Sequence, residues 1–324
     1  MLFDFILILF GLLTLFYGAD WLVKGAARLA SSFGVSPLVI GLTLVAFGTS
    51  TPELLVSILA ALRRSSDIAL GNVVGSNIAN IGLILGLTAM IFPVVVHSQV
   101  MRRELPMMLG FSALTYALLL DRVIGRLDGL FLFVILVLFN VLTYRLAQQA
   151  TARHDAAAAE FEEFEELEGL ISDDEAINQP VELGRTVVGI VILVIGAQSL
   201  VSGATSIARA FGISELVIGI TLVAFGTSLP ELATSMVAAF RDEDDISVGN
   251  IVGSNIYNLL AVLGITALVR PISVAPSVLR LELPVMLAFS FILWPLIRDN
   301  VLARWQGALL FVGYILFTLF LFAG

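Results

Sequence analysis

Cysteine is absent from this chain of 324 residues, and only two histidines, His97 and His154, occur in it. The absence of cysteine excludes disulfide bonds and thiolate metal sites, and it leaves the redox compartment open. We assign both histidines to connecting segments, so neither is a candidate ligand. Charged residues are also scarce: they make up 13% of the chain, against about a quarter in soluble domains.

Apolar residues make up 59% of the chain, and they form long runs from end to end. Several runs have about 20 residues, which is enough to cross ~30 Å of hydrocarbon as a helix. The first stretch, MLFDFILILFGLLTLFYGADWLVKG, lacks the positive n-region of a signal peptide, so we interpret it as the first span. The composition predicts an all-α polytopic membrane protein.

The chain repeats itself at an offset of 178 residues without a gap. Residues 36–86 and 214–264 share 32 identities in 51 positions. Two homologous halves, 1–146 and 182–324, are therefore predicted, joined by a linker at 147–181. This linker is acidic, because residues 147–183 hold 11 acids and one base.

Each half is expected to contain five spans. We place them at 3–24, 36–62, 68–92, 104–120 and 124–146, and at 182–204, 214–240, 246–269, 282–298 and 302–322. Since five is odd, the second half enters the membrane from the opposite side, as in many secondary transporters. The predicted fold is ten transmembrane helices in two inverted five-helix repeats.

Basic residues predict the orientation. The side that holds the linker collects ten of them, and the side that holds both termini collects seven. Because basic loops stay inside, we predict a cytoplasmic linker and external termini. The small size and the lack of a large regulatory domain favour a prokaryotic plasma (inner) membrane.

Two nearly identical stretches, LVAFGTSTPE and LVAFGTSLPE, place Glu53 and Glu231 in the middle of apolar spans. A carboxylate at bilayer depth usually faces a cavity and marks an ion path. The preceding prolines, Pro52 and Pro230, cannot donate a backbone hydrogen bond, so each helix should kink and release carbonyl oxygens four to seven residues before the glutamate.

Oxygen-bearing side chains surround each glutamate at helical spacing. One face carries Thr49, Ser50, Glu53 and Ser57, and the next span carries Asn72, Ser76 and Asn80; the twins are Thr227, Ser228, Glu231, Ser235, Asn250, Ser254 and Asn258. Oxygen ligands suit hard cations, and two facing carboxylates suit a divalent ion. Helix packing is the alternative interpretation of the small residues, and it stays open for Gly71 and Gly75.

The motifs GTSTPE…GNVVGSNIAN and GTSLPE…GNIVGSNIYN resemble the two α-repeats of the calcium/cation antiporter superfamily, the sodium/calcium exchangers and their prokaryotic relatives. The resemblance implies four ion sites between the second, third, seventh and eighth helices. It assigns calcium to Glu53 and Glu231 with the backbone oxygens of Thr49 and Thr227. It assigns sodium to these glutamates with Ser50, Ser228, Ser76, Ser254 and the carbonyls of Ala46 and Ala224. Asn80 and Asn258 complete the central polar site, and Asn258 replaces an aspartate of some relatives, which argues against potassium co-transport.

We predict an antiporter that exchanges Ca²⁺ for Na⁺ by alternating access. Two buried like charges are costly without cations, and this cost would couple the two fluxes. Proton-coupled exchange of Ca²⁺ or another divalent cation through the same carboxylates is the alternative. A channel is a further one, which inverted repeats disfavour. Because no nucleotide motif, protease dyad or His/Cys cluster occurs, we expect no enzyme, cofactor or nucleic-acid partner, and no protein partner is inferred.

Asp20 and Lys24 form an i, i+4 pair near the end of the first span, whereas their twins are Gln198 and Ser202. We interpret this pair as an interfacial ion pair outside the site.

Overall fold

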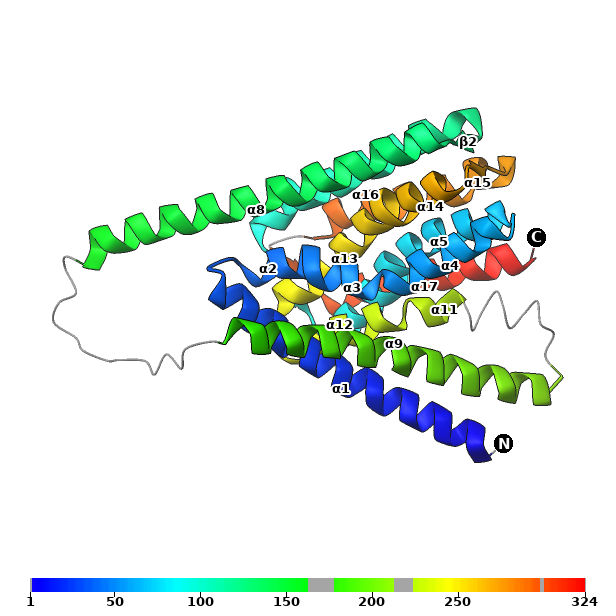
Figure 1. The fold of residues 1–324 in the computed structure, drawn as a ribbon, viewed down its shortest axis with the longest axis horizontal. Helices are drawn as coiled ribbons and strands as arrows, with labels where there is room; N and C mark the ends of the chain where they lie inside the picture. The colour runs from blue at the N-terminus through cyan, green and yellow to red at the C-terminus, as the bar shows by residue number, and fades with distance from the viewer. Residues whose placement is uncertain (1, 163–177, 213–223, 298–299, 324) are drawn as a thin grey trace.

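The structure, a computed structural model, describes residues 2–162, 178–212, 224–297 and 300–323. The helices lie side by side along one axis, and both chain ends lie at one end of the bundle (Figure 1). We call this the terminal end. The opposite end, where α8 (Arg126–Glu162) finishes and α9 (Gln179–Ala210) begins, is the linker end.

The first half contains α1 (Leu2–Ser32) and then several spans interrupted by wider π-helical turns, written η. In order they are α2 (Pro37–Ile40), η1 (Gly41–Val45), α3 (Ala46–Thr49), α4 (Thr51–Leu62), α5 (Ser66–Ala79), η2 (Asn80–Leu85), α6 (Gly86–Ile91), β1 (Val94–Val95), η3 (Val100–Glu104), α7 (Leu105–Leu118), the 3₁₀ turn η4 (Leu119–Asp121), β2 (Val123–Ile124) and α8.

The second half repeats this order. After α9 come α11 (Ala224–Thr227), α12 (Leu229–Phe240), α13 (Asp244–Tyr257), η6 (Asn258–Val262), α14 (Leu263–Val269), β3 (Ile272–Ser273), α15 (Pro276–Arg280), α16 (Glu282–Leu296), β4 (Val301–Leu302) and α17 (Arg304–Ala323). Residues 213–223, which begin the predicted span 214–240, lie outside the described residues.

Seven helices in the described part of the chain are long and apolar enough to cross a membrane, or eight if the bent pair Pro37–Thr49 and Thr51–Leu62 is one span. Two predicted spans are not among them. In the region 104–120, α7 has 14 residues, and in the region 214–240 the described helix α12 has 12 residues. A predominantly helical protein with several spans is therefore confirmed.

Two short strand pairs close the bundle. β1 pairs with β4 and β2 pairs with β3, both antiparallel. The Ser273 N–H donates to Ser66 Oγ at the start of α5, 3.3 Å away, whereas β1 follows the far end of the same span. The two pairs therefore lie at opposite ends of the bundle, and each joins one strand from either half.

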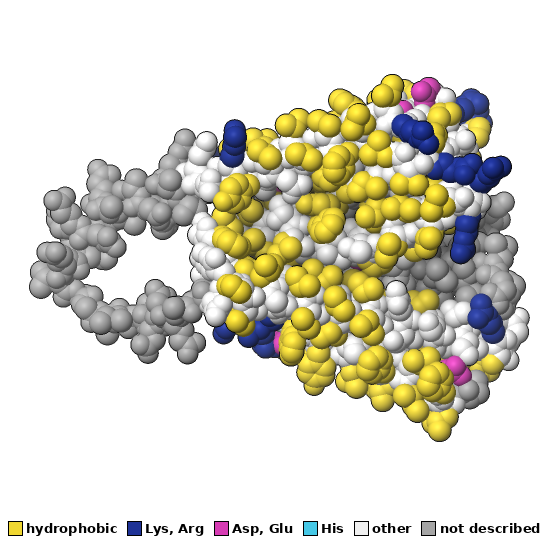
Figure 2. Space-filling model, in the orientation of Figure 1, with side chains coloured by type: hydrophobic (Ala, Val, Ile, Leu, Met, Phe, Trp, Pro, Cys, Tyr) yellow, Lys and Arg dark blue, Asp and Glu magenta, His cyan; other side chains and the backbone are white. Residues whose placement is uncertain are grey.

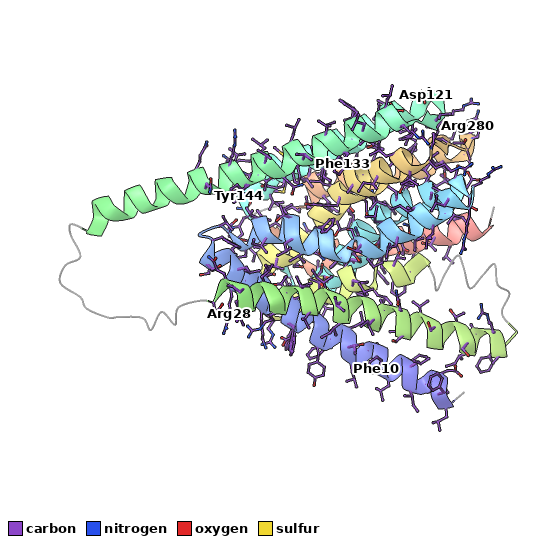
Figure 3. The ribbon with its side chains drawn as sticks, in the orientation of Figure 1. Phe10, Arg28, Asp121, Phe133, Tyr144 and Arg280 are labelled. Carbon is purple, nitrogen blue, oxygen red and sulfur yellow. The ribbon has the colours of Figure 1, made fainter. Side chains whose placement is uncertain are left out.

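Burial separates central spans from outer ones. In the most apolar stretch of 18 residues within each span, 78% of the residues are buried in Ser66–Ile91 and 89% in Asp244–Val269. In Arg304–Leu321 the share is 17%. Hydrophobic side chains cover the sides of the bundle, and Lys and Arg gather near its ends (Figure 2). Arg28 lies toward one end, and Asp121 and Arg280 lie at the other (Figure 3). This apolar band with charged ends is typical of a membrane protein.

Helices α1 and α9 pack closely through glycines. The glycines recur every seven residues on both helices: Gly11, Gly18 and Gly25, and Gly189, Gly196 and Gly203. A methyl group added to Gly18 would lie 2.9 Å from the Leu193 nitrogen, and one added to Gly189 would lie 2.7 Å from the Leu22 nitrogen. Only glycine permits backbones to approach this closely.

Helix α8, which contains the fifth predicted span, is longer than predicted. We expected the span to end at residue 146, but α8 continues without a break to Glu162 and has 37 residues. At 1.5 Å per residue this helix exceeds the thickness of a membrane core, so its second part projects beyond the bundle (Figure 1). Residues 163–177, which include most of the acidic run, lie outside the described residues.

Candidate ion-binding site

The predicted kink in the first half is confirmed. Helix α3 ends at Thr49, Ser50 leaves the helix with ψ of 3°, and α4 starts at Thr51, with a bend of 42° between the two segments. Pro52 therefore occupies the first turn of a new helix, where a proline lacks no hydrogen bond. Ser228 has the same role between α11 and α12, with ψ of 5°.

One detail of the prediction is wrong. We expected a free carbonyl at Ala46, but this oxygen accepts a hydrogen bond from the Ser50 N–H at 3.0 Å. The helix loses fewer backbone hydrogen bonds at the break than a proline inside a helix would remove, because only Ser50 separates α3 from α4. The second lone pair of a carbonyl can still bind a cation.

The two glutamates are buried, each 1% exposed, and each is bonded to the opposite half. Ser228 Oγ lies 3.3 Å from Glu53 Oε1, and Ser50 Oγ lies 3.5 Å from Glu231 Oε1. The remaining oxygen of each carboxylate, Oε2, has no hydrogen-bond partner among the described residues. Buried acceptors without donors are the atoms that a cation would satisfy.

Asparagines fix the backbone next to each glutamate. Asn72 Nδ2 donates to the Glu53 carbonyl at 3.0 Å and to Ser57 Oγ at 2.9 Å. Asn250 Nδ2 makes the twin contacts, at 3.3 Å to the Glu231 carbonyl and 3.0 Å to Ser235 Oγ. These bonds join α4 to α5 and α12 to α13, so the residues of the polar stripes hold the glutamate-bearing turns in place.

Thr49 connects the two halves further. Its hydroxyl donates to Asn250 Oδ1 at 3.0 Å and lies 3.4 Å from Ser254 Oγ. On the other side, the hydroxyls of Thr227 and Ser76 lie beside the Glu53 carboxylate. The predicted threonine and serine positions of both halves therefore meet around the two carboxylates.

A group of buried asparagines follows Ser76 in the first half and Ser254 in the second. Asn80 Nδ2 donates to Asn255 Oδ1 at 3.0 Å, across the two halves. Both amide atoms of Asn77 and of Asn258 have no partner among the described residues. Asn77 and Asn255 are not among the predicted ligands, because they lie off the i, i+4 stripe. Their sequence signal is the i, i+3 spacing to Asn80 and Asn258.

All the predicted side-chain ligands are buried. The members are Thr49, Ser50, Glu53, Ser76, Asn80, Thr227, Ser228, Glu231, Ser254 and Asn258. Ala46 begins α3 and is also buried, and Ala224 begins α11. In the described ranges no cluster of three or more His, Cys, Asp or Glu occurs. The site thus combines two carboxylates with neutral oxygens, a donor set that suits a hard cation.

A cavity of about 400 Å³ reaches this site from one side. It lies between α4 and α9, and its lining includes Pro52, Leu59, Gln198 and Thr227. Pro52 and Thr227 belong to the two helix breaks, so the cavity borders the breaks that carry the site.

The model of the sodium/calcium exchanger protein family matches residues 3–145 and 182–323. The chain belongs to the sodium/calcium exchanger family. Each matched segment contains one carboxylate of the site, Glu53 in the first and Glu231 in the second. The unmatched residues between the segments correspond to the acidic region.

Full-length relatives agree with this membership. The inner membrane protein YrbG of Escherichia coli is 40% identical over 98% of this chain and 96% of its own length. The sodium/calcium exchanger MaX1 of Methanosarcina acetivorans is 36% identical over 98% of both chains. Similarity is therefore not confined to the two motifs.

The fold matches a solved member of the family. A structure of the sodium-calcium exchanger NCX_Mj, soaked with Na⁺ and Sr²⁺, superposes with a TM-score of 0.82 at 32% identity and covers 97% of each chain. The arrangement of bent helices in this chain is therefore that of a cation exchanger of the sodium/calcium exchanger family.

Proposed function

We propose that this protein is a secondary antiporter that exchanges Ca²⁺ for Na⁺ by alternating access. The observation that carries the proposal is the crossed pair of contacts, in which Ser228 faces Glu53 and Ser50 faces Glu231. Each carboxylate is thus bonded to the opposite half, and a cation between them would draw both halves together. The predicted ligand set described above would hold the ions.

Charge balance gives the coupling. Two carboxylates buried side by side repel each other, and no described residue forms a salt bridge with either of them. One Ca²⁺ or two Na⁺ would neutralise the pair, whereas the empty site would keep an uncompensated charge away from water. The loaded protein can then change conformation, and the empty protein is held back.

We also propose the inverted arrangement of the two halves, with ten spans in total. The strand pairs support it: β3 lies 178 positions after β1, and β4 lies 178 positions after β2, yet the two pairs occupy opposite ends of the bundle. A repeat that reappears at the opposite end has been turned over. With the excess of basic residues at the linker end, this predicts an inner-membrane protein with a cytoplasmic linker.

The test is radioactive calcium uptake into proteoliposomes loaded with sodium and diluted into sodium-free buffer, at clamped voltage and equal pH. We expect uptake that requires internal sodium and falls to the level of empty vesicles in Glu53→Gln. Asp67→Asn is the matched control, because it removes an exposed carboxylate from α5 outside the site. Size-exclusion chromatography and thermal unfolding check that each variant is folded.

Other outcomes redirect the proposal. Uptake that ignores sodium but follows a pH gradient would replace sodium with protons as the coupling ion at the same carboxylates. Full sodium-dependent uptake by folded Glu53→Gln would refute the site.

A further inference from the structure

An ion pair joins α1 to the end of α12. Asp20 Oδ1 accepts a hydrogen bond from the Arg241 guanidinium, and Asp20 Oδ2 accepts one from Lys24 Nζ at 2.8 Å. Asp20 is only 7% exposed. Its partner Arg241 comes 221 positions later in the chain. We call the pair Asp20–Arg241 the latch.

The latch lies over a sealed surface. Leu22 and Val23 of α1 belong to the same buried apolar cluster as Val237 and Ala238 of α12. Arg241 directly follows α12, and α13 then starts beside β1, since the Val95 N–H donates to Asp244 Oδ2. The latch and this apolar contact therefore lie together between α1 and α12, on the side of the site that faces the linker end. We call this packed contact between α1 and α12 the sealed route.

The related route on the other side is open and has no such pair. At the offset of 178, Asp20 corresponds to Gln198 and Arg241 corresponds to Arg63. Gln198 is exposed and lines the 400 Å³ cavity between α4 and α9. Leu59, which also lines it, is 52% exposed, whereas its twin Val237 is 7% exposed. No ion pair of Arg63 occurs among the described residues.

We propose that the latch is a one-sided gate that favours the conformation closed toward the linker end. Opening this side would separate a mostly buried carboxylate from its guanidinium. Closing the other side would bring Gln198 toward Arg63, a contact without opposite charges, which is weaker. The two conformations that alternating access requires are therefore unequal in this protein, and Asp20 sets the bias. This inference rests on the proposed function for the alternation, not for the identity of the cargo.

The test uses the absence of cysteine from the chain. Single cysteines at the twin positions Val56→Cys, in the open cavity, and Thr234→Cys, in the sealed route, report which side is accessible. Thr234 suits this exchange, because its hydroxyl has no partner among the described residues. The rate of labelling by a water-soluble maleimide is measured on purified protein in nanodiscs, without calcium or sodium gradients.

We expect Asp20→Asn to raise the Thr234→Cys labelling rate about 5- to 30-fold, the range that corresponds to losing one partly buried ion pair. The charge swap Asp20→Arg with Arg241→Asp should restore slow labelling. Gln198→Glu, which supplies the missing opposite charge to Arg63, should act in the other direction and slow the labelling of Val56→Cys.

Unchanged labelling of Thr234→Cys in folded Asp20→Asn overturns the latch, and so does a charge swap that leaves labelling fast. Transport assays separate this failure from failure of the proposed function. If labelling shifts but no calcium is exchanged, the gate stands and the cargo assignment falls. If sodium-dependent calcium uptake is intact but labelling never shifts, the gate falls alone.

Discussion

The surface between α1 and α9 differs from the surface between α1 and α12. Glycines such as Gly18 and Gly189 bring the first two backbones together, and Glu182 bonds to Arg28 at 3.0 Å and to Arg185 at 2.7 Å. Toward α12, α1 presents apolar side chains and the latch. Close backbone contact fixes a geometry, whereas apolar surfaces can separate and repack. The contrast indicates that α1 and α9 form one unit packed backbone to backbone, whereas α1 and α12 are joined through side chains.

The strongest way to break this comparison is to add a methyl group inside the unit. Gly18→Ala places a methyl group 2.9 Å from the Leu193 nitrogen, and we expect the free energy of unfolding to fall by about 1–3 kcal/mol. Gly75→Ala is the matched control, because a methyl group there meets nothing within 4 Å. Thermal unfolding of both variants in the same detergent measures the effect. Equal stability of the two would show that the glycine contacts do not hold the unit.

A smaller effect is expected among the helices that carry the site, α4 with α5 and α12 with α13. Asn72→Ala removes the hydrogen bonds to the Glu53 carbonyl and to Ser57, and it should cost about 1 kcal/mol of stability. It should also weaken calcium binding, measured by titration calorimetry, because the glutamate-bearing turn loses its support. Asn250→Ala should cost at least as much, since Asn250 makes the twin contacts and also accepts a hydrogen bond from Thr49. A loss of binding in one variant only would contradict the equivalence of the two halves at the site.

The smallest effect sharpens the role of the latch. Lys24 is 46% exposed at its side chain and bonds to the second oxygen of Asp20. Exposed pairs contribute about 0–1 kcal/mol, so Lys24→Gln should change Thr234→Cys labelling far less than Asp20→Asn does. Equal effects of the two variants would mean that Asp20 acts through Lys24 and not through Arg241.

Most of the fold could be predicted from the sequence, because its signals are local. Apolar runs of about 20 residues locate helices, and Pro52 beside Glu53 locates the bend that the structure has at Ser50. The repeat pairs Ser50 with Ser228 and Glu53 with Glu231, and the structure places each serine beside the glutamate of the other half. The serine, threonine and asparagine positions chosen from helical spacing are buried, apart from Asn72, which is half-buried.

Partners far apart in the chain could not be predicted in this way. The sequence interpretation placed Asp20 and Lys24 in an ion pair, which the structure confirms, but it gave Arg241 no partner. The repeat does not reveal this partner either, because Gln198, which corresponds to Asp20 in the second half, carries no charge. Helix spacing likewise missed Asn255, whose bond to Asn80 depends on how α13 faces η2.

Helix packing also failed as an explanation for Gly71 and Gly75. A methyl group on either would meet no atom within 4 Å, so no helix in the described part of the chain approaches them closely. Both glycines instead border a second cavity, between α5, α15 and α17. A small-xxx-small pattern permits close contact between helices, but it does not supply the neighbouring helix.

The two strand pairs change how the connection between the halves is understood. Each pair takes one strand from the first half and one from the second, so backbone hydrogen bonds fasten the halves to each other at both ends of the bundle. The two halves are therefore held together by backbone pairing at both ends, and not only by the covalent connection between them in the sequence. A change in the length or charge of residues 163–177 would remove neither strand pair, because neither pair contains those residues.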